Sequence, residues 1–124
     1  MSMSVITFSV PVTVTPETVQ DLLICAFEGG SNYWYDDLEP LKETSTKSTP
    51  SERFYDDIVT HGFSLTDQYT GKKHEITPEK IKNGVISFYN NHPKHYADAT
   101  SENADAITGD VFLQTVVFGE LVYG

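Results

Sequence analysis

The chain of 124 residues is short of cysteine and of long apolar runs. A single cysteine, Cys25, cannot form an internal disulfide, which is typical of proteins that work in a reducing cytoplasm. No apolar run approaches the roughly 20 residues that a membrane-spanning helix needs. The first residues also lack the basic segment and the apolar core of a signal peptide. We therefore expect one cytoplasmic domain, residues 1–124, without membrane contact.

Basic residues are absent from both ends of the chain. Residues 1–41 hold six carboxylates and residues 97–124 hold five, and neither range contains a Lys or an Arg. All eight basic residues lie between Lys42 and Lys94, and the net charge is −10. Acidic ends repel phosphate, which disfavours direct nucleic-acid binding. Such a surface suits either solubility or a cationic protein partner.

Motifs of common catalytic and metal sites are also missing. The chain contains no G-x-S-x-G, phosphate-binding loop or dinucleotide fingerprint. His92 and His95 are separated by a proline, which breaks the helix that would align them on a metal. Cys25 stands among apolar residues, as an inert core thiol does. The acidic pairs Asp36-Asp37 and Asp56-Asp57 are typical of solvated turns. We expect no enzyme, no metal and no cofactor.

The most distinctive segment present is a run of aromatic residues after two glycines. The apolar stretch Leu22–Phe27 predicts a helix, and Gly29-Gly30 is expected to end it. The next residues are Ser31 and then the predicted binding set Asn32, Tyr33, Trp34 and Tyr35. Consecutive residues cannot all face one way. Some of these rings should therefore brace the core, while others face solvent or a partner.

Hydrophobic periodicity predicts two strand-then-helix units. Alternating apolar residues predict a strand over Val5–Val14, with Pro11 at a sheet edge or bulge. Thr15-Pro16-Glu17 and Thr77-Pro78-Glu79 are both typical helix starts, with Thr as cap and Pro at the first position. The second helix should end near Asn91-His92. A hairpin over Gly62–Ile76 precedes it.

Three polar stretches interrupt these elements. Asp36–Pro40 is interpreted as a turn, and Lys42–Glu52, rich in Ser and Thr, as a flexible loop. A short element around Phe54–Val59 is expected to follow. Asp98–Asn103 is polar and offers Thr100 or Ser101 as a helix cap.

A final helix is predicted from about Ala104 to Phe118. It is apolar almost all round, and Gly119 should end it. Such a helix is either central or part of a subunit interface. We expect Leu121–Gly124 to be extended and held down, and a dimer to form through this helix and its tail. The predicted fold is α+β, with about three helices against a small, mainly antiparallel sheet.

Two stretches resemble small bacteriophage- and prophage-encoded proteins of no established activity. They are Leu22–Tyr35 (LLICAFEGGSNYWY) and the C-terminal part, with Asp110–Gln114 (DVFLQ) and Phe118–Gly124 (FGELVYG). The likeness covers a third to a half of the chain and is weakest over residues 40–75. It implies a phage accessory gene expressed in a bacterial cytoplasm, and it supplies no site residue.

Three functions are compatible with this context. The first is a binding protein, such as an anti-defence factor that blocks a host protein or sequesters a nucleotide-like signal. The second is an acidic mimic of DNA that occupies a nucleic-acid-binding enzyme. The third is a structural or assembly role in the virion. A mimic needs exposed carboxylates in a stripe, whereas a ligand binder needs a pocket lined by aromatic rings.

Overall fold

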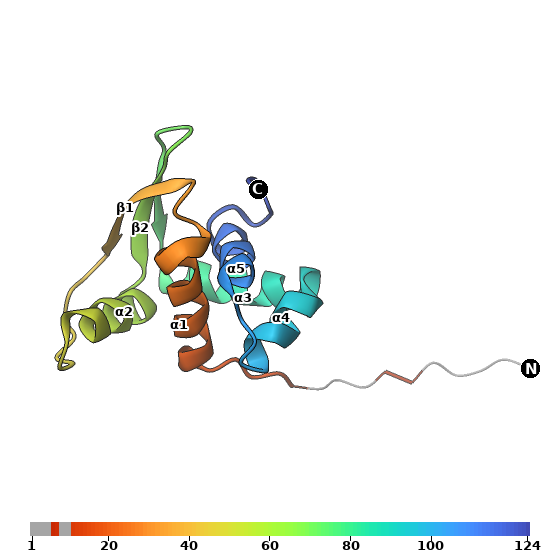
Figure 1. Ribbon diagram of the computed structural model, residues 1–124. Coiled ribbons are helices and arrows are strands. Elements are labelled where there is room, and N and C mark those ends of the chain that lie inside the picture. Colours follow the sequence, from red (N-terminus) through yellow and green to blue (C-terminus); the bar gives the residue numbers. More distant parts are fainter. Residues whose placement is uncertain (1–5, 8–10) are drawn as a thin grey trace, which may run out of the picture.

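The computed structural model describes residues 6–7 and 11–124, which form an α+β fold (Figure 1). A three-stranded antiparallel sheet in the order β1-β2-β3 lies beside helices grouped around α5. In chain order the elements are α1 (Pro16–Cys25), the π-helical turn η1 (Ala26–Gly30), β1 (Tyr35–Pro40), α2 (Pro50–His61), β2 (Phe63–Asp67), β3 (Lys73–Ile76), α3 (Pro78–Asn91), α4 (Pro93–Thr100) and α5 (Ala106–Phe118). Across these described ranges, none of the helices combines the length and apolar character that crossing a bilayer requires.

Three of the helices begin with a threonine followed by a proline. The side chains of Thr15, Thr49 and Thr77 each accept a hydrogen bond from the amide three residues later. This confirms the two predicted helix starts and adds a third, that of α2. Residues 50–52, assigned to a loop from the sequence, are thus the first turn of a helix. The rest of that loop, residues 42–49, contacts α2, because the buried Asp57 carboxylate accepts hydrogen bonds from the amides of Thr44 and Ser45.

The predicted hairpin is confirmed, but its neighbour in the sheet is not a turn. In the hairpin Phe63 pairs with Ile76 and Leu65 pairs with His74. Residues 36–40, interpreted as a turn, instead belong to β1, which pairs antiparallel with β2 and is bulged between Asp36 and Glu39. An edge strand bonds to one neighbour only, so it tolerates outward carboxylates and a terminal proline. Because β1 contains these outward carboxylates and a terminal proline, its sequence lacks the alternating apolar pattern by which a strand is predicted.

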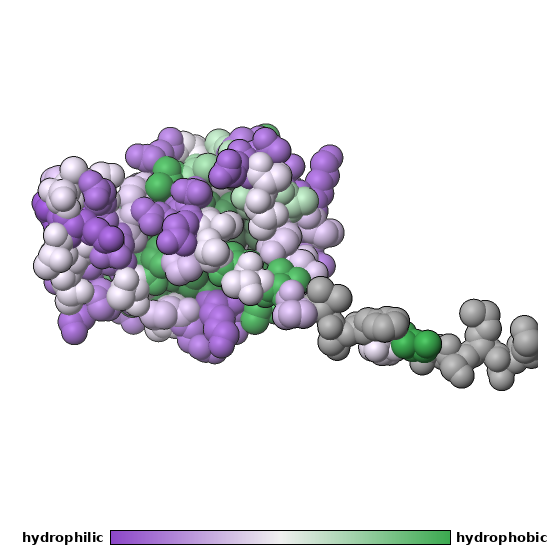
Figure 2. Space-filling view, turned by 90° about the horizontal axis from the view of Figure 1, so that it is seen from below, coloured by the Kyte–Doolittle hydropathy of each residue, from purple (hydrophilic) through white to green (hydrophobic). Residues whose placement is uncertain are grey.

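The strand predicted over Val5–Val14 is not found in its described part. Residues 6–7 and 11–14 have no regular structure, and the remaining positions lie outside the described residues. Val12 and Val14 instead line an apolar hollow of about 460 Å³ between α1 and α3. Figure 2 shows hydrophobic side chains on the face from which this segment leaves the body. Among the described residues of this stretch, Val14 packs against the core, whereas Ile6 and Val12 are 70% and 48% exposed.

Helix α5 is the centre of the helical group. It contacts α1, η1, α3, α4 and β3, and its residues from Thr108 to Val117 are buried except Asp110, which is half-buried. The prediction of a central helix that ends at Gly119 is confirmed, since Gly119 adopts a left-handed φ of 78°. One chain therefore covers this helix by itself, which removes the argument from which a dimer was expected. Self-association through the tail stays a prediction.

The start of α5 differs from the expectation. The cap is Asp105, whose side chain accepts a hydrogen bond from the Thr108 amide at 2.9 Å, so the helix begins at Ala106 and not at Ala104. Thr100 and Ser101, the expected caps, lie at the end of α4. The sequence analysis missed α4 because Pro93 was interpreted only as a helix stop, although proline is also favoured at a first helical position.

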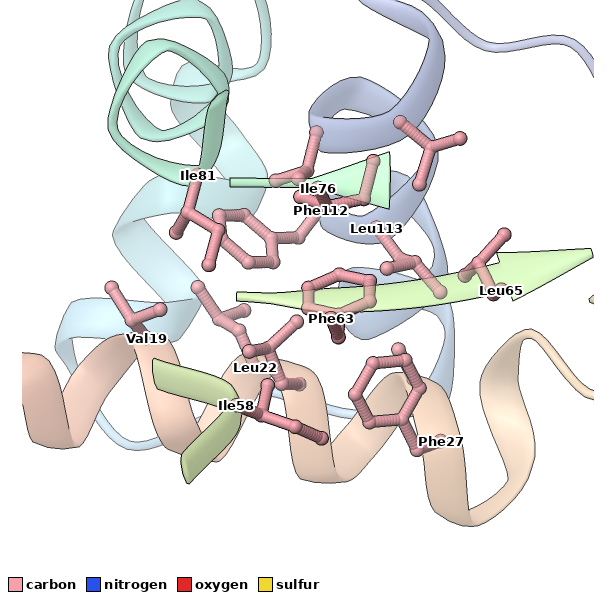
Figure 3. Packing of buried hydrophobic residues seen from close by; sticks show 14 of the residues in the cluster. Val19, Leu22, Phe27, Ile58, Phe63, Leu65, Ile76, Ile81, Phe112 and Leu113 are labelled. Atoms are coloured by element: carbon pink, nitrogen blue, oxygen red, sulfur yellow. The ribbon is translucent and has the colours of Figure 1, made fainter. Parts of the chain in front are cut away.

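The core lies between the sheet and the helices. Phe63 of β2 stands at its middle, with Phe27, Ile58 and Phe112 from three helical segments around it (Figure 3). Gly109 lets α5 approach α1 closely, because a Cβ at this position would lie 2.6 Å from the Ala26 amide nitrogen. The close approach brings the first turns of α5 beside the aromatic segment.

Candidate functional site

The aromatic segment leaves α1 through η1 and is held against the start of α5. The chain departs from helical geometry at Glu28 and Gly29, as the two glycines predict. Gly30 lies directly against the backbone of Ala106, since a Cβ on Gly30 would overlap the Ala106 carbonyl oxygen. A larger residue at position 30 would push the aromatic segment away from α5. The glycine pair therefore both ends the helix and sets the position of the rings.

The three rings face different ways, as the sequence analysis requires. Trp34 has 0% of its surface exposed, and its ring packs on Phe118 and stacks on Tyr123 with centroids 5.9 Å apart. Tyr35 is also buried, and its hydroxyl donates to the carbonyl of Phe27. Tyr33 is 41% exposed. Trp34 and Tyr35 thus brace the core, whereas Tyr33 lies at the surface.

Asn32 is exposed beside Tyr33, as expected for the predicted binding set. Its side-chain oxygen accepts a hydrogen bond from the Tyr35 hydroxyl at 3.0 Å. Burial, together with the nearby Tyr55, raises the pKa of Tyr35 to about 12. Of the four predicted residues, the structure therefore leaves Asn32 and Tyr33 at the surface and places the other two inside.

The carboxylate of Asp110 joins the aromatic segment to α5. Its Oδ1 accepts hydrogen bonds from Ser31 Oγ at 2.7 Å and Trp34 Nε1 at 2.8 Å. Its Oδ2 accepts from Tyr33 OH at 2.6 Å and from Gln114 Nε2 at 3.1 Å. Partial burial and the bond to Asp110 raise the pKa of Tyr33 to about 12. One side chain of α5 therefore fixes the positions of Ser31, Tyr33 and Trp34.

Gln114, one turn after Asp110, holds the C-terminal tail. Its Oε1 accepts hydrogen bonds from the amides of Val122 and Tyr123, both at 2.8 Å, and its Nε2 reaches the Tyr123 carbonyl. The Tyr123 hydroxyl donates to Asp67 Oδ2 at 2.6 Å. The expected anchoring of the tail is confirmed. The tail thus forms a fixed wall beside the aromatic segment.

An open groove of about 560 Å³ lies between these parts. Its lining comes from residues 29–33, 106–114 and 121–124. We call it the Tyr33 groove, and its principal residues are Gly30, Tyr33, Ile107, Asp110, Leu121 and Gly124. Ile107 is 67% exposed and Leu121 is 49% exposed. Exposed aliphatic side chains around a polar centre are typical of a surface that binds another molecule.

The other two sites considered from the sequence, a nucleophilic cysteine and a metal centre, lack the geometry that their chemistry needs. Burial and the nearby carboxylates of Asp21, Asp105 and Glu28 raise the pKa of Cys25, the opposite of what a nucleophilic thiol needs. Among residues 6–7 and 11–124, no group of three or more His, Cys, Asp or Glu side chains is placed to hold a metal ion.

Comparison of the chain with models of protein families, with curated proteins and with solved structures finds no match. The site is therefore interpreted from its own geometry. Sequence reasoning found Tyr33 but missed Ile107, Asp110 and Leu121. The only available signal was that Asp110 is a lone carboxylate on an otherwise apolar helix, which indicates a polar partner inside the fold.

Proposed function

We propose that the protein acts by binding another protein, without catalysis, and that the Tyr33 groove is the surface it uses. In the context implied by the sequence resemblance, it is a small phage accessory factor that blocks a host protein in the bacterial cytoplasm. The observation that carries the proposal is the ring of exposed Tyr33, Ile107 and Leu121 around Asp110. Aromatic and aliphatic anchors of this kind supply most of the energy of protein interfaces.

The composition of the groove favours a protein as the ligand over a nucleotide-like signal. Its lining contains no Lys, Arg or His within the described part of the chain. These described residues supply no cation to hold the phosphates of a nucleotide, and the Asp110 carboxylate in the lining repels them, so a nucleotide-like signal does not suit this groove. The aromatic segment also presents only one ring, Tyr33, and keeps Trp34 inside. A stacking platform for a base would expose more of these rings.

A second candidate function, DNA mimicry, is favoured by a separate observation. Exposed carboxylates follow one another along α1, η1 and β1; they are Asp21, Glu28, Asp36, Asp37 and Glu39. A mimic would bind through these charges and would be indifferent to the aliphatic rim of the groove. Substitution of Ile107 therefore separates the two functions.

Affinity capture from lysate of the bacterial host tests the proposal. The bait is the protein itself, compared with Ile107→Ser in the groove and with Ile86→Ser as a matched control. Ile86 is also a helical isoleucine, 51% exposed, but it lies on α3 beside the hollow of Val12. We expect one host protein to be retained by the wild type and by Ile86→Ser, and to be lost with Ile107→Ser.

Two other outcomes would count against the groove. Retention of the same host protein by Ile107→Ser, together with its loss on combined Asp36→Asn and Asp37→Asn substitution, would favour the DNA mimic. Capture of no specific protein by the wild type, in lysates of infected and uninfected cells alike, would contradict both functions.

A further inference from the structure

The Tyr33 groove is built only from stretches of the chain that have no positive charge. All of its lining belongs to residues 29–33, 106–114 and 121–124, and these fall within the two ranges that contain carboxylates but no Lys or Arg. Ionic attraction acts over roughly one Debye length, about 8 to 10 Å at physiological salt. Among the described residues of the lining, no Lys, Arg or His offsets the negative charge of Asp110, so the groove favours a cation beside this carboxylate.

The local carboxylates strengthen this preference. Glu28 directly precedes Gly29 and Asp105 directly precedes Ala106, and Gly29 and Ala106 both line the groove. Asp110 lies in the lining itself, and its four hydrogen-bond donors within the described residues are all uncharged groups. These bonds orient the Asp110 carboxylate without supplying a positive charge to balance it.

The apolar rim adds a second requirement. Tyr33, Ile107 and Leu121 present rings and branched chains to solvent beside Asp110. A lysine or arginine can lay its aliphatic stem along such a surface and direct its charged end at the carboxylate. The exposed ring of Tyr33 lies beside Asp110 and can act as a cation–π partner for the same side chain. An adjoining aliphatic side chain would cover Ile107 and Leu121.

We propose that the Tyr33 groove receives a short segment of a partner protein in which a lysine or arginine stands beside an aliphatic residue. The inference rests on the proposed function and names the chemistry of the partner. An extended segment suits an open groove with exposed sides better than a small cation does, since small-molecule sites enclose most of their ligand. A second copy of this chain seated groove to groove is disfavoured, because two such acidic surfaces repel each other; self-association through other parts of the tail is a separate prediction.

Selection from a displayed library of random short peptides tests the chemistry directly. The protein is used as bait, and clones are counter-selected on Ile107→Ser. We expect the retained peptides to share a Lys or Arg next to Leu, Ile, Val or Met. A labelled synthetic copy should bind at least about tenfold more weakly to Ile107→Ser than to Ile86→Ser.

Changes in the peptide then test the charge without disturbing the protein. Replacing its Arg by citrulline, or its Lys by norleucine, should weaken binding by about fivefold or more. Raising NaCl from about 50 to about 500 mM should weaken the parent peptide more than the neutral one. Peptides that depend on Ile107 but carry no cation would overturn this inference and leave the proposed function standing. Selection of no peptide that depends on Ile107 would also overturn it, and the capture experiment would then decide the proposed function separately.

Discussion

Removing the Asp110 carboxylate should destabilise the fold by about 2 to 4 kcal/mol. Three of its four donors belong to the buried residues Ser31, Trp34 and Gln114. Gln114 Nε2 keeps the Tyr123 carbonyl as an acceptor. The donors of Ser31 and Trp34 are therefore the ones left without a partner, and each such buried donor costs about 1 to 3 kcal/mol. Tyr33 is partly exposed and can turn to water, so it adds little. The Ser31 hydroxyl can rotate toward another acceptor. The expected loss of stability for Asp110→Ala is therefore smaller than the sum of the two largest costs, one for each unpaired donor.

Asp110→Asn is the matched control for this change. It keeps one oxygen that can accept from Ser31 and Trp34, but its amide group faces Gln114 Nε2, which is also a donor. We expect it to lose about 1 to 2 kcal/mol, between the wild type and Asp110→Ala. Urea unfolding followed by circular dichroism measures all three proteins. A loss below about 0.5 kcal/mol for Asp110→Ala would refute the argument that this carboxylate holds the segment in place.

Three further outcomes are expected. Trp34 should be protected from acrylamide quenching, and Trp34→Ala should lose about 3 to 5 kcal/mol, whereas ready quenching would contradict its burial. A hydrogen bond to Asp67 and burial raise the pKa of Tyr123 to about 12. The contribution of the Tyr123 hydroxyl to the free energy of unfolding is therefore full below pH 10 and falls as the pH rises toward 12. Tyr123→Phe should flatten this alkaline loss of stability, and an unchanged pH profile of stability would contradict the prediction. In limited proteolysis, Asp57→Ala should speed cleavage within residues 42–49, because it removes the carboxylate that binds the amides of Thr44 and Ser45. Equal cleavage rates in the variant and the wild type would show that Asp57 does not restrain this segment.

Local patterns in the sequence were sufficient for the helix starts and for the hairpin. A threonine cap followed by a proline acts within one turn, and the pairing of Phe63 with Ile76 follows from a short connection. These features need no knowledge of distant parts of the chain. The same holds for Gly119, whose left-handed conformation ends α5.

The features that depend on distant contacts were not predictable in the same way. Asp110 bonds to residues 76 to 79 positions away, and its place on an apolar helix indicates a polar partner without identifying which residues supply it. β1 is an acidic edge strand that becomes regular only by pairing with β2. Residues 11–14 show the reverse case, since their alternation is typical of a strand, but they have no regular structure and Val12 and Val14 line a hollow between α1 and α3.

The candidate site was therefore half predictable. The sequence located the aromatic segment and required its rings to divide between core and surface, and the structure assigns Trp34 to the core and Tyr33 to the surface. The opposite side of the groove, with Ile107 and Leu121, comes from a different part of the chain. The close approaches at Gly30 and Gly109 bring α5 beside the aromatic segment, and Gln114 holds the tail that carries Leu121.

The most direct test of the account is to measure affinity and stability together for Ile107→Ser. Because this side chain is exposed, its loss should change the free energy of unfolding by no more than about 0.5 kcal/mol. Because it borders the Tyr33 groove, titration of the captured host protein should show binding weakened by about tenfold or more, with Ile86→Ser unchanged in both measurements. Wild-type affinity in Ile107→Ser would contradict the claim that this groove is the binding surface.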